Sequence, residues 1–297
     1  MAALLKKRKE KALVQSSSEV PRFKTPFHEA HFKGKLSARK VLPELVIEVN
    51  DEILSPCAMQ IKMRKWEKFT NPLQAVGHNM VKEFYANAWK PEKDKRKPYT
   101  YTTMVQGKDI NFAPKNIKRV LKLRNDPLLN VGSYHERKAS KDYRLEEVQE
   151  CLCLEGREWV RHRDGRPHYL RRNDLDPMAK GWYDFVCRSI LPTTNRSELT
   201  VERAVLIHSI IVGENINVEE IIAYQIYKTD LPSSLPFSGI IAALCLEAKV
   251  VTLKDDTLIP QELPIVGEAM IRVREPRARN PRANQARQEA PQQEQPP

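Results

Sequence analysis

The sequence predicts a mainly α-helical protein: a single multi-helix domain with two small β-hairpins and disordered termini. Three observations support this prediction. Apolar residues recur at helical spacing through most of residues 22–271, and proline and capping residues precede several of these stretches. Two short stretches contain glycine turns typical of hairpins, and one of them is rich in β-forming residues. Because the sequence has no internal repeat, we expect one domain over residues 22–271.

Helices and one hairpin are expected in the first half of this domain. The predicted helices cover residues 28–40, 59–69 and 73–89, and a short one begins at Pro114. The segment "YTYTTMVQGKDINF" (99–112) is rich in β-forming residues and is interrupted by Gly107-Lys108. This pattern predicts a hairpin.

The second half carries clearer helix start signals. They are Asp176-Pro177, an N-cap followed by proline, then Thr200, and the capping-box pattern Asn217-x-x-Glu220. The segment "AVLIHSIIV" (204–212) is apolar nearly all round and should be a central buried helix. A further apolar helix is expected over 236–248.

Both ends of the chain differ from this domain in composition. Residues 1–21 are rich in lysine and serine, and residues 272–297 are rich in proline, glutamine and arginine, so neither can bury enough apolar surface to order itself. The formal net charge is +12, and part of it lies in these ends. The N-terminal run has the composition of a nuclear-import signal or of an arm that binds polyanions. Its basic residues are Lys6, Lys7, Arg8, Lys9 and Lys11.

Several protein classes are disfavoured by what the sequence lacks. It has no apolar run of about 18 residues and no secretory signal, so we expect no membrane association and an intracellular location, with the nucleus favoured over the cytoplasm. The five cysteines lie in apolar contexts and are expected to be free thiols. Phosphate-binding glycine loops, a nucleophile elbow and an isolated acidic triad are missing, so we expect no cofactor and no enzymatic activity.

The segment "CLCLEGREWVRHRDGRPH" (151–168) raises the question of a metal site, because it holds two cysteines and two histidines. On a helix, Cys151 and Cys153 would lie about 200° apart and could not share an ion. A two-residue turn at Asp164-Gly165 would place the two histidines on opposite faces of a hairpin. We therefore expect core thiols beside a surface hairpin, and no metal.

The same hairpin is the candidate nucleic-acid contact, because arginines bind phosphate and aromatic rings stack on bases. The candidate residues are Arg157, Trp159, Arg161, Arg163, Arg166, Arg171 and Arg172. The alternative, which we favour on sequence alone, is that Trp159 and Tyr169 pack inward while the arginines are only solvated.

Five segments occur in an order that is typical of one family. They are "MVKEFYANAW" (80–89), "VQGKDINFAPKNIKRVLKL" (105–123), "LCLEGREWV" (152–160), "YLRRNDLDPMAKGWYDFVCRSILPTTNRSELTVERAVLIHSIIVGENINVEEII" (169–222) and "LPFSGIIAALCLEAKV" (235–250). Together they resemble the putative plant transposon protein domain, which is found in plant proteins associated with gypsy-type retroelements. The resemblance covers roughly residues 60–260 and implies a mobile-element origin and a mostly helical fold, but no catalytic residues.

These observations lead us to expect a non-enzymatic structural or interaction protein of plant retroelement origin, either capsid-like or associated with nucleic acid through its basic arms. RNA or DNA is the expected partner, and self-association stays open. The alternatives are a mobile-element enzyme of the nuclease or transposase type and an adaptor that binds only protein.

Overall fold

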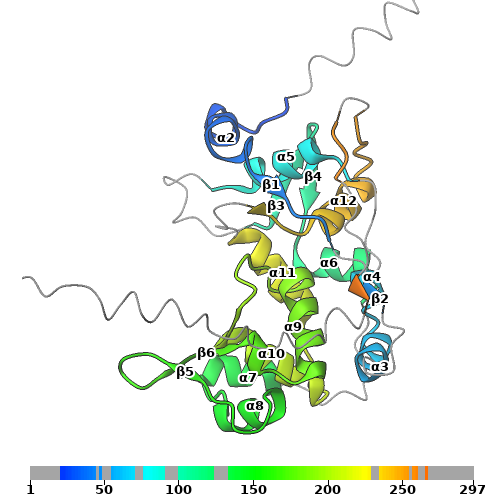
Figure 1. Ribbon diagram of the computed structural model, residues 1–297. Coiled ribbons are helices and arrows are strands. Elements are labelled where there is room, and N and C mark those ends of the chain that lie inside the picture. Colours follow the sequence, from blue (N-terminus) through cyan, green and yellow to red (C-terminus); the bar gives the residue numbers. More distant parts are fainter. Residues whose placement is uncertain are drawn as a thin grey trace, which may run out of the picture.

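The computed structural model describes residues 21–44, 47–48, 55–70, 76–90, 100–123, 133–228, 234–253, 256–259 and 265–266 (Figure 1). Within these ranges the helices are α2 (Pro26–His31), the π-helical η1 (Phe32–Leu36), α3 (Ser55–Met63), α4 (Glu67–Thr70), α5 (His78–Ala88), α6 (Pro114–Leu121), α7 (Ser133–Ser140), α8 (Leu145–Leu152), the 3₁₀-helical η3 (Arg172–Asp174), α9 (Pro177–Ser189), α10 (Val201–Ile211), α11 (Val218–Tyr227) and α12 (Ser238–Glu247). The strands are β1 (Lys40–Val41), β2 (Ile47–Glu48), β3 (Thr102–Val105), β4 (Lys108–Asn111), β5 (Val160–Arg161), β6 (Pro167–Arg171), β7 (Glu198–Thr200), β8 (Ser234–Leu235) and β9 (Ile265–Val266). The predicted mainly α-helical class is confirmed.

Two groups of elements lie at opposite ends of the molecule (Figure 1). At one end, α5 packs on β3, and α12 contacts both α5 and β4. At the other end, α10 contacts α7, α8 and α9, and the sheet that contains β6 and β7. Contacts of α6 with α11 and α12 join the two groups.

The core is built from long apolar helices, as the sequence predicted. Residues 204–210 of α10 are all buried, which confirms the prediction of a central helix. In α9, Trp182 and Phe185 pack edge to face with ring centroids 5.5 Å apart, and Trp66 stacks on Phe185 from the segment between α3 and α4. This aromatic cluster attaches the N-terminal helices to the second half of the chain.

The three helix start signals of the second half are correct in position, but only one forms the expected capping bonds. The Asp176 carboxylate accepts hydrogen bonds from the backbone N–H groups of Met178 at 2.7 Å and Ala179 at 3.0 Å. Thr200 occupies the N-cap of α10 without a side-chain capping bond. The capping box at Asn217 is wrong: its side-chain amide donates to the Glu220 carboxylate at 3.4 Å rather than accepting from the backbone.

Helix α5 begins later than the apolar pattern predicted. Gly77 is extended and forms a bridge with Leu258, and the helix starts only at His78. The Asp256 carboxylate then accepts from the backbone N–H groups of Asn79 and Met80, so a residue far along the chain caps this helix. The apolar stripe could not reveal this, because the cap comes from a distant segment.

Both predicted hairpins are present, and other strand pairs were not predicted. β3 and β4 pair antiparallel across Gln106-Gly107, whose positive φ values suit a tight hairpin turn. β5 and β6 form the second hairpin, and β7 extends it to three strands. The parallel pairs β1–β8 and β2–β9 have two residues per strand, which is too short for a sequence pattern.

The predicted arm and tail lie outside the described residues, apart from Pro21. In the part of the chain that is described, no helix has the length and apolar character needed to span a membrane.

Candidate nucleic-acid interface

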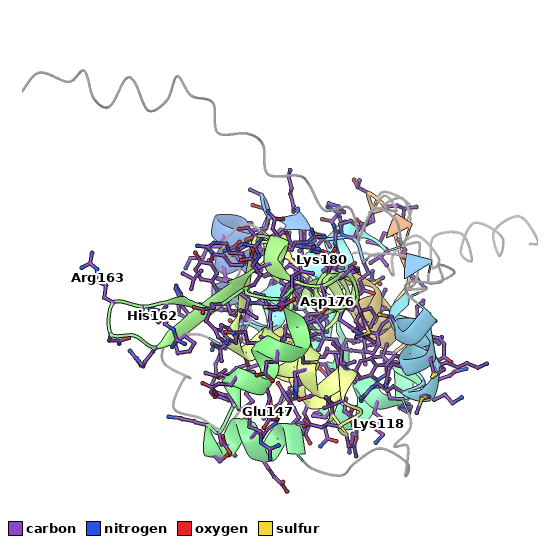
Figure 2. The ribbon with its side chains drawn as sticks, turned by 60° about the horizontal axis from the view of Figure 1, so that its bottom comes forward. Lys118, Glu147, His162, Arg163, Asp176 and Lys180 are labelled. Atoms are coloured by element: carbon purple, nitrogen blue, oxygen red, sulfur yellow. The ribbon has the colours of Figure 1, made fainter. Side chains whose placement is uncertain are left out.

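The hairpin formed by β5 and β6 projects from the helical body (Figure 2). His162 and Arg163 lie on the projecting part, and Arg163 is at its outer end. The base of the hairpin is held by β7, which pairs with β6 through Leu170 and Leu199, both fully buried. A rigid sheet therefore supports an exposed basic loop.

The turn differs from the two-residue turn predicted from Asp164-Gly165. The backbone N–H of His162 donates to the Arg166 carbonyl at 2.8 Å, so three residues, Arg163 to Gly165, form the loop. Gly165 has a φ of 82°, the left-handed conformation that such a loop requires and that glycine adopts without strain.

The longer turn shifts the pairing by one residue, and this shift overturns the prediction that the two histidines face opposite ways. A β-bulge follows the turn. Val160 pairs with Tyr169, whereas Arg161 pairs with Pro167, so His168 is an extra residue on its strand. Because His162 lies opposite Arg166, and His168 follows Arg166 by two residues, alternation places both histidines on one face. The rings of His162 and His168 consequently stack on each other, with their centroids 3.9 Å apart and both residues exposed.

Trp159 has to be removed from the candidate contacts. Its side chain is only 5% exposed, and its indole N–H donates to the Leu145 carbonyl at 3.1 Å. Because the ring packs in the core, it cannot stack on a base in this conformation. For Trp159, the alternative prediction of inward packing is therefore correct.

Arg172 also has an internal partner. Its guanidinium donates to the Asp184 carboxylate at 2.6 Å, and Arg196 pairs with the same carboxylate from the loop after α9. Only 6% of the Asp184 side chain is exposed. This pair of arginines neutralises a buried charge and ties η3 to α9, so Arg172 has a structural role.

The other five candidate arginines are exposed, but they differ in how they are paired. Arg157 and Arg171 both lie near the Asp174 carboxylate, at 3.9 Å and 3.7 Å, where solvent screens the interaction. Arg161 donates to the Gly165 carbonyl at 3.0 Å. Among the residues with described positions, Arg163 has neither a hydrogen bond nor an ion pair.

Arg166 forms the closest ion pair on the hairpin. Its guanidinium contacts the Asp164 carboxylate at 2.7 Å, and its backbone N–H donates to the same group. The Arg166 side-chain hydrogen bond, supported by the backbone bond, lowers the pKa of Asp164 and keeps this carboxylate ionised. The segment 157–172 has six arginines and two carboxylates, a formal net charge of +4 with neutral histidines.

The two cysteines near the hairpin, Cys151 and Cys153, are not activated thiols. Burial raises the pKa of Cys153 to about 11 and also raises the pKa of Cys151, so both remain protonated near neutral pH. The described ranges contain no group of three or more His, Cys, Asp or Glu residues that could hold a metal ion.

A buried ionic cluster in the body was missed from the sequence. Arg137 donates to the Glu214 carboxylate at 2.8 Å and to the Ser209 hydroxyl, and one of its N–H groups lies 3.4 Å from Nδ1 of His208. Arg64 donates to the carbonyls of Glu214 and Ile210. The Ser209 hydroxyl itself donates to a carbonyl within α10, so the cluster stabilises the fold and presents no nucleophile. Sequence reasoning assigned no element to α7, which carries Arg137.

The described geometry thus defines a helical domain with a projecting basic hairpin. A family model, the putative plant retrotransposon-related domain, matches residues 62–251, which is more than half of the chain. The chain therefore belongs to this family, and the resemblance seen in the sequence is confirmed. No curated protein and no solved structure gives a match to it.

The remaining candidates, Lys6, Lys7, Arg8, Lys9 and Lys11, lie outside the described residues. Their expected role as an import signal or polyanion arm stays a prediction.

Proposed function

We propose that this protein is a non-enzymatic, nucleic-acid-associated protein of retroelement origin that contacts RNA or DNA through the β5–β6 hairpin. The observation that carries the proposal is the exposed loop at the end of the hairpin, with Arg161, Arg163 and Arg166 around the stacked histidines. The family membership supports the retroelement origin.

The chemistry of the loop suits a flexible phosphate backbone. Arg163 is exposed and has no partner among the described residues, so its guanidinium can form a two-pronged contact with a phosphate. The exposed ring of the histidine stack offers a flat surface for an unpaired base. The hairpin projects from the helical body, so its outer residues are accessible to a strand (Figure 2).

Fluorescence anisotropy with a labelled 20-nucleotide RNA, at several salt concentrations, tests the proposal. The triple variant Arg161→Gln/Arg163→Gln/Arg166→Gln should bind about tenfold or more weakly, and its salt slope should fall by about 2. The matched control Lys35→Gln/Lys62→Gln/Lys115→Gln removes the same charge from exposed residues of other elements. Equal losses in both variants would mean that net charge alone attracts RNA, and would refute a hairpin site.

Further measurements distinguish the proposal from two other functions. Cleavage of RNA or DNA that requires a divalent metal and is abolished by one carboxylate substitution would identify a nuclease and overturn the non-enzymatic assignment. The absence of salt-dependent binding, together with capture of a defined protein, would identify an adaptor. Size-exclusion chromatography with light scattering, with and without RNA, shows whether the protein also assembles in a capsid-like manner.

We also propose that residues 1–21 direct the protein to the nucleus, because Lys6 to Lys11 form a basic run. A fluorescent protein fused to residues 1–20 should enter the nucleus. The same fusion with the five basic residues replaced by Gln is the control, and equal cytosolic distribution of both fusions would refute the proposal.

A further inference from the structure

A cavity of about 620 Å³ lies between α7, α10 and α11 and the segment that leads into α12. It is built by parts of the chain that are far apart in sequence, and its volume falls within the range of roughly 300–1,000 Å³ that small-ligand sites occupy. The proposed role of the hairpin does not involve it. The cavity therefore raises a separate question about what it binds.

The lining of the cavity is partly polar and partly apolar, and its apolar part includes aromatic rings. Leu191 and Phe237, at most 2% exposed, line it together with Pro192. Tyr224 also lines it and is 44% exposed; Tyr227, on the same helix, is 41% exposed, and its ring meets the Tyr224 ring edge to face. An exposed ring beside an apolar surface suits a planar ligand.

Cations surround this apolar surface. The Lys228 ammonium lies 5.6 Å from the centroid of the Tyr224 ring, and it forms no ion pair with any described residue. Lys138 pairs with Glu202 at 2.7 Å, and both side chains are exposed. Because the lining has three basic residues, Arg203 included, against one carboxylate, it favours an anion.

Arg203 gives the cavity a fixed shape. Its guanidinium donates to the carbonyls of Leu191 at 3.1 Å and Pro192 at 3.2 Å, and to the Thr200 hydroxyl at 3.2 Å. These three bonds hold the loop after α9 against the start of α10. Such preorganisation lowers the entropic cost of binding.

We propose that this cavity binds a nucleotide, with the base packed on Tyr224 and the phosphate paired with Lys228. A nucleotide combines the planar ring and the anionic group that the lining favours, either as a free 5′-nucleotide or as one unit of a single strand. The proposal goes beyond the hairpin and does not depend on it.

Isothermal titration of the full chain with 5′-AMP, adenosine and a 5′-phosphorylated pentaadenylate tests this inference. At least one phosphorylated ligand should bind in a saturable manner and more tightly than adenosine. Tyr224→Ala and Lys228→Gln should each weaken that binding about tenfold. Phe27→Ala and Lys115→Gln, which change exposed residues away from the lining, should leave it unchanged, and thermal melting checks that every variant is folded.

Comparison of the two phosphorylated ligands shows whether the cavity binds a free nucleotide or one unit of a single strand. Binding of 5′-AMP assigns the site to free nucleotides, whereas binding of the pentamer alone assigns it to a strand. If neither binds, or if Tyr224→Ala and Phe27→Ala weaken binding equally, the inference is wrong. The hairpin triple variant should retain 5′-AMP binding, so this result is independent of the outcome for the proposed function.

Discussion

The imidazole rings of His162 and His168 stack at a centroid distance of 3.9 Å on one face of the basic hairpin. His168 also meets the Tyr169 ring edge to face at 5.0 Å, so three rings lie next to one another. This arrangement depends on the three-residue turn, since a two-residue turn would shift the pairing by one residue and place the two histidines on opposite faces. Arg166, which lies opposite His162, adds a positive charge to this face.

If the ring stack contacts bases, its removal should affect single strands more than duplexes. His162→Ala/His168→Ala should weaken binding to a 20-nucleotide single-stranded RNA by about fivefold or more, because one base loses its stacking partner. Binding to the corresponding duplex should change little, since its bases are already stacked. Anisotropy with both ligands measures this, and equal losses would assign the histidines a role in shaping the loop only.

The buried Arg137–Glu214 pair should be a major determinant of stability. Arg137→Leu leaves the Glu214 carboxylate without its partner, at a position where only 10% of that side chain is exposed. We expect a loss of about 3–5 kcal/mol in the free energy of unfolding, measured by urea denaturation. The neighbouring exposed pair provides the control: Lys138→Gln should cost at most about 1 kcal/mol. Similar losses of stability in Arg137→Leu and Lys138→Gln would contradict the prediction that the buried pair is a major determinant of stability.

The N-cap of α9 allows a smaller and more local test. Asp176→Ala removes the acceptor for two backbone N–H groups and should lower stability by about 0.5–2 kcal/mol. Asp142→Ala, at an exposed residue before α8, should change it by less than about 0.5 kcal/mol. Thermal melting measures the loss of stability in both variants. Equal losses would indicate a general effect of removing negative charge and would contradict the capping role of Asp176.

Glu44 should make stability depend on pH near neutrality. Its carboxyl group accepts from the backbone N–H groups of Gly239 and Ile240 at the start of α12, and burial raises its pKa from 4.5 to about 7. Between these two values the folded chain retains a proton that the unfolded chain has released. The contribution of Glu44 to stability therefore decreases as the pH rises from about 4.5 to about 7, and stays low above that.

Glu44→Gln does not titrate but keeps the accepting carbonyl. Its stability relative to the natural chain should therefore increase over this pH window by about 1–3 kcal/mol in total. Urea unfolding of both chains at pH 5, 6, 7 and 8 measures the difference. A difference that stays constant with pH would show that the group titrates normally.

The helical class and several helix starts could be predicted because they depend on local signals. The Asp176-Pro177 pair is one example, since both the capping carboxylate and the fixed proline φ act within one turn of the helix. The burial of α10 followed from an apolar surface with no polar face. By contrast, the start of α5 was misplaced because its cap, Asp256, comes from a distant segment.

The candidate site could be predicted only in part, again because some of its contacts come from distant parts of the chain. Composition located the arginines of the hairpin, but it could not separate Arg163, which is exposed, from Arg172, which pairs with Asp184. It also selected Trp159 as the aromatic contact, whereas the exposed rings belong to the two histidines. The cavity beside Tyr224 had no sequence signal, because its walls come from separate helices.

The sequence by itself determined the mainly helical class, the family and the position of a basic hairpin, since each follows from the order and spacing of neighbouring residues. Only the tertiary structure decided which arginines are neutralised by buried carboxylates, which rings are exposed, and where a cavity forms. These properties depend on contacts that neighbouring residues do not specify, and one additional residue in the turn from Arg163 to Gly165 is enough to reverse the face on which a side chain lies.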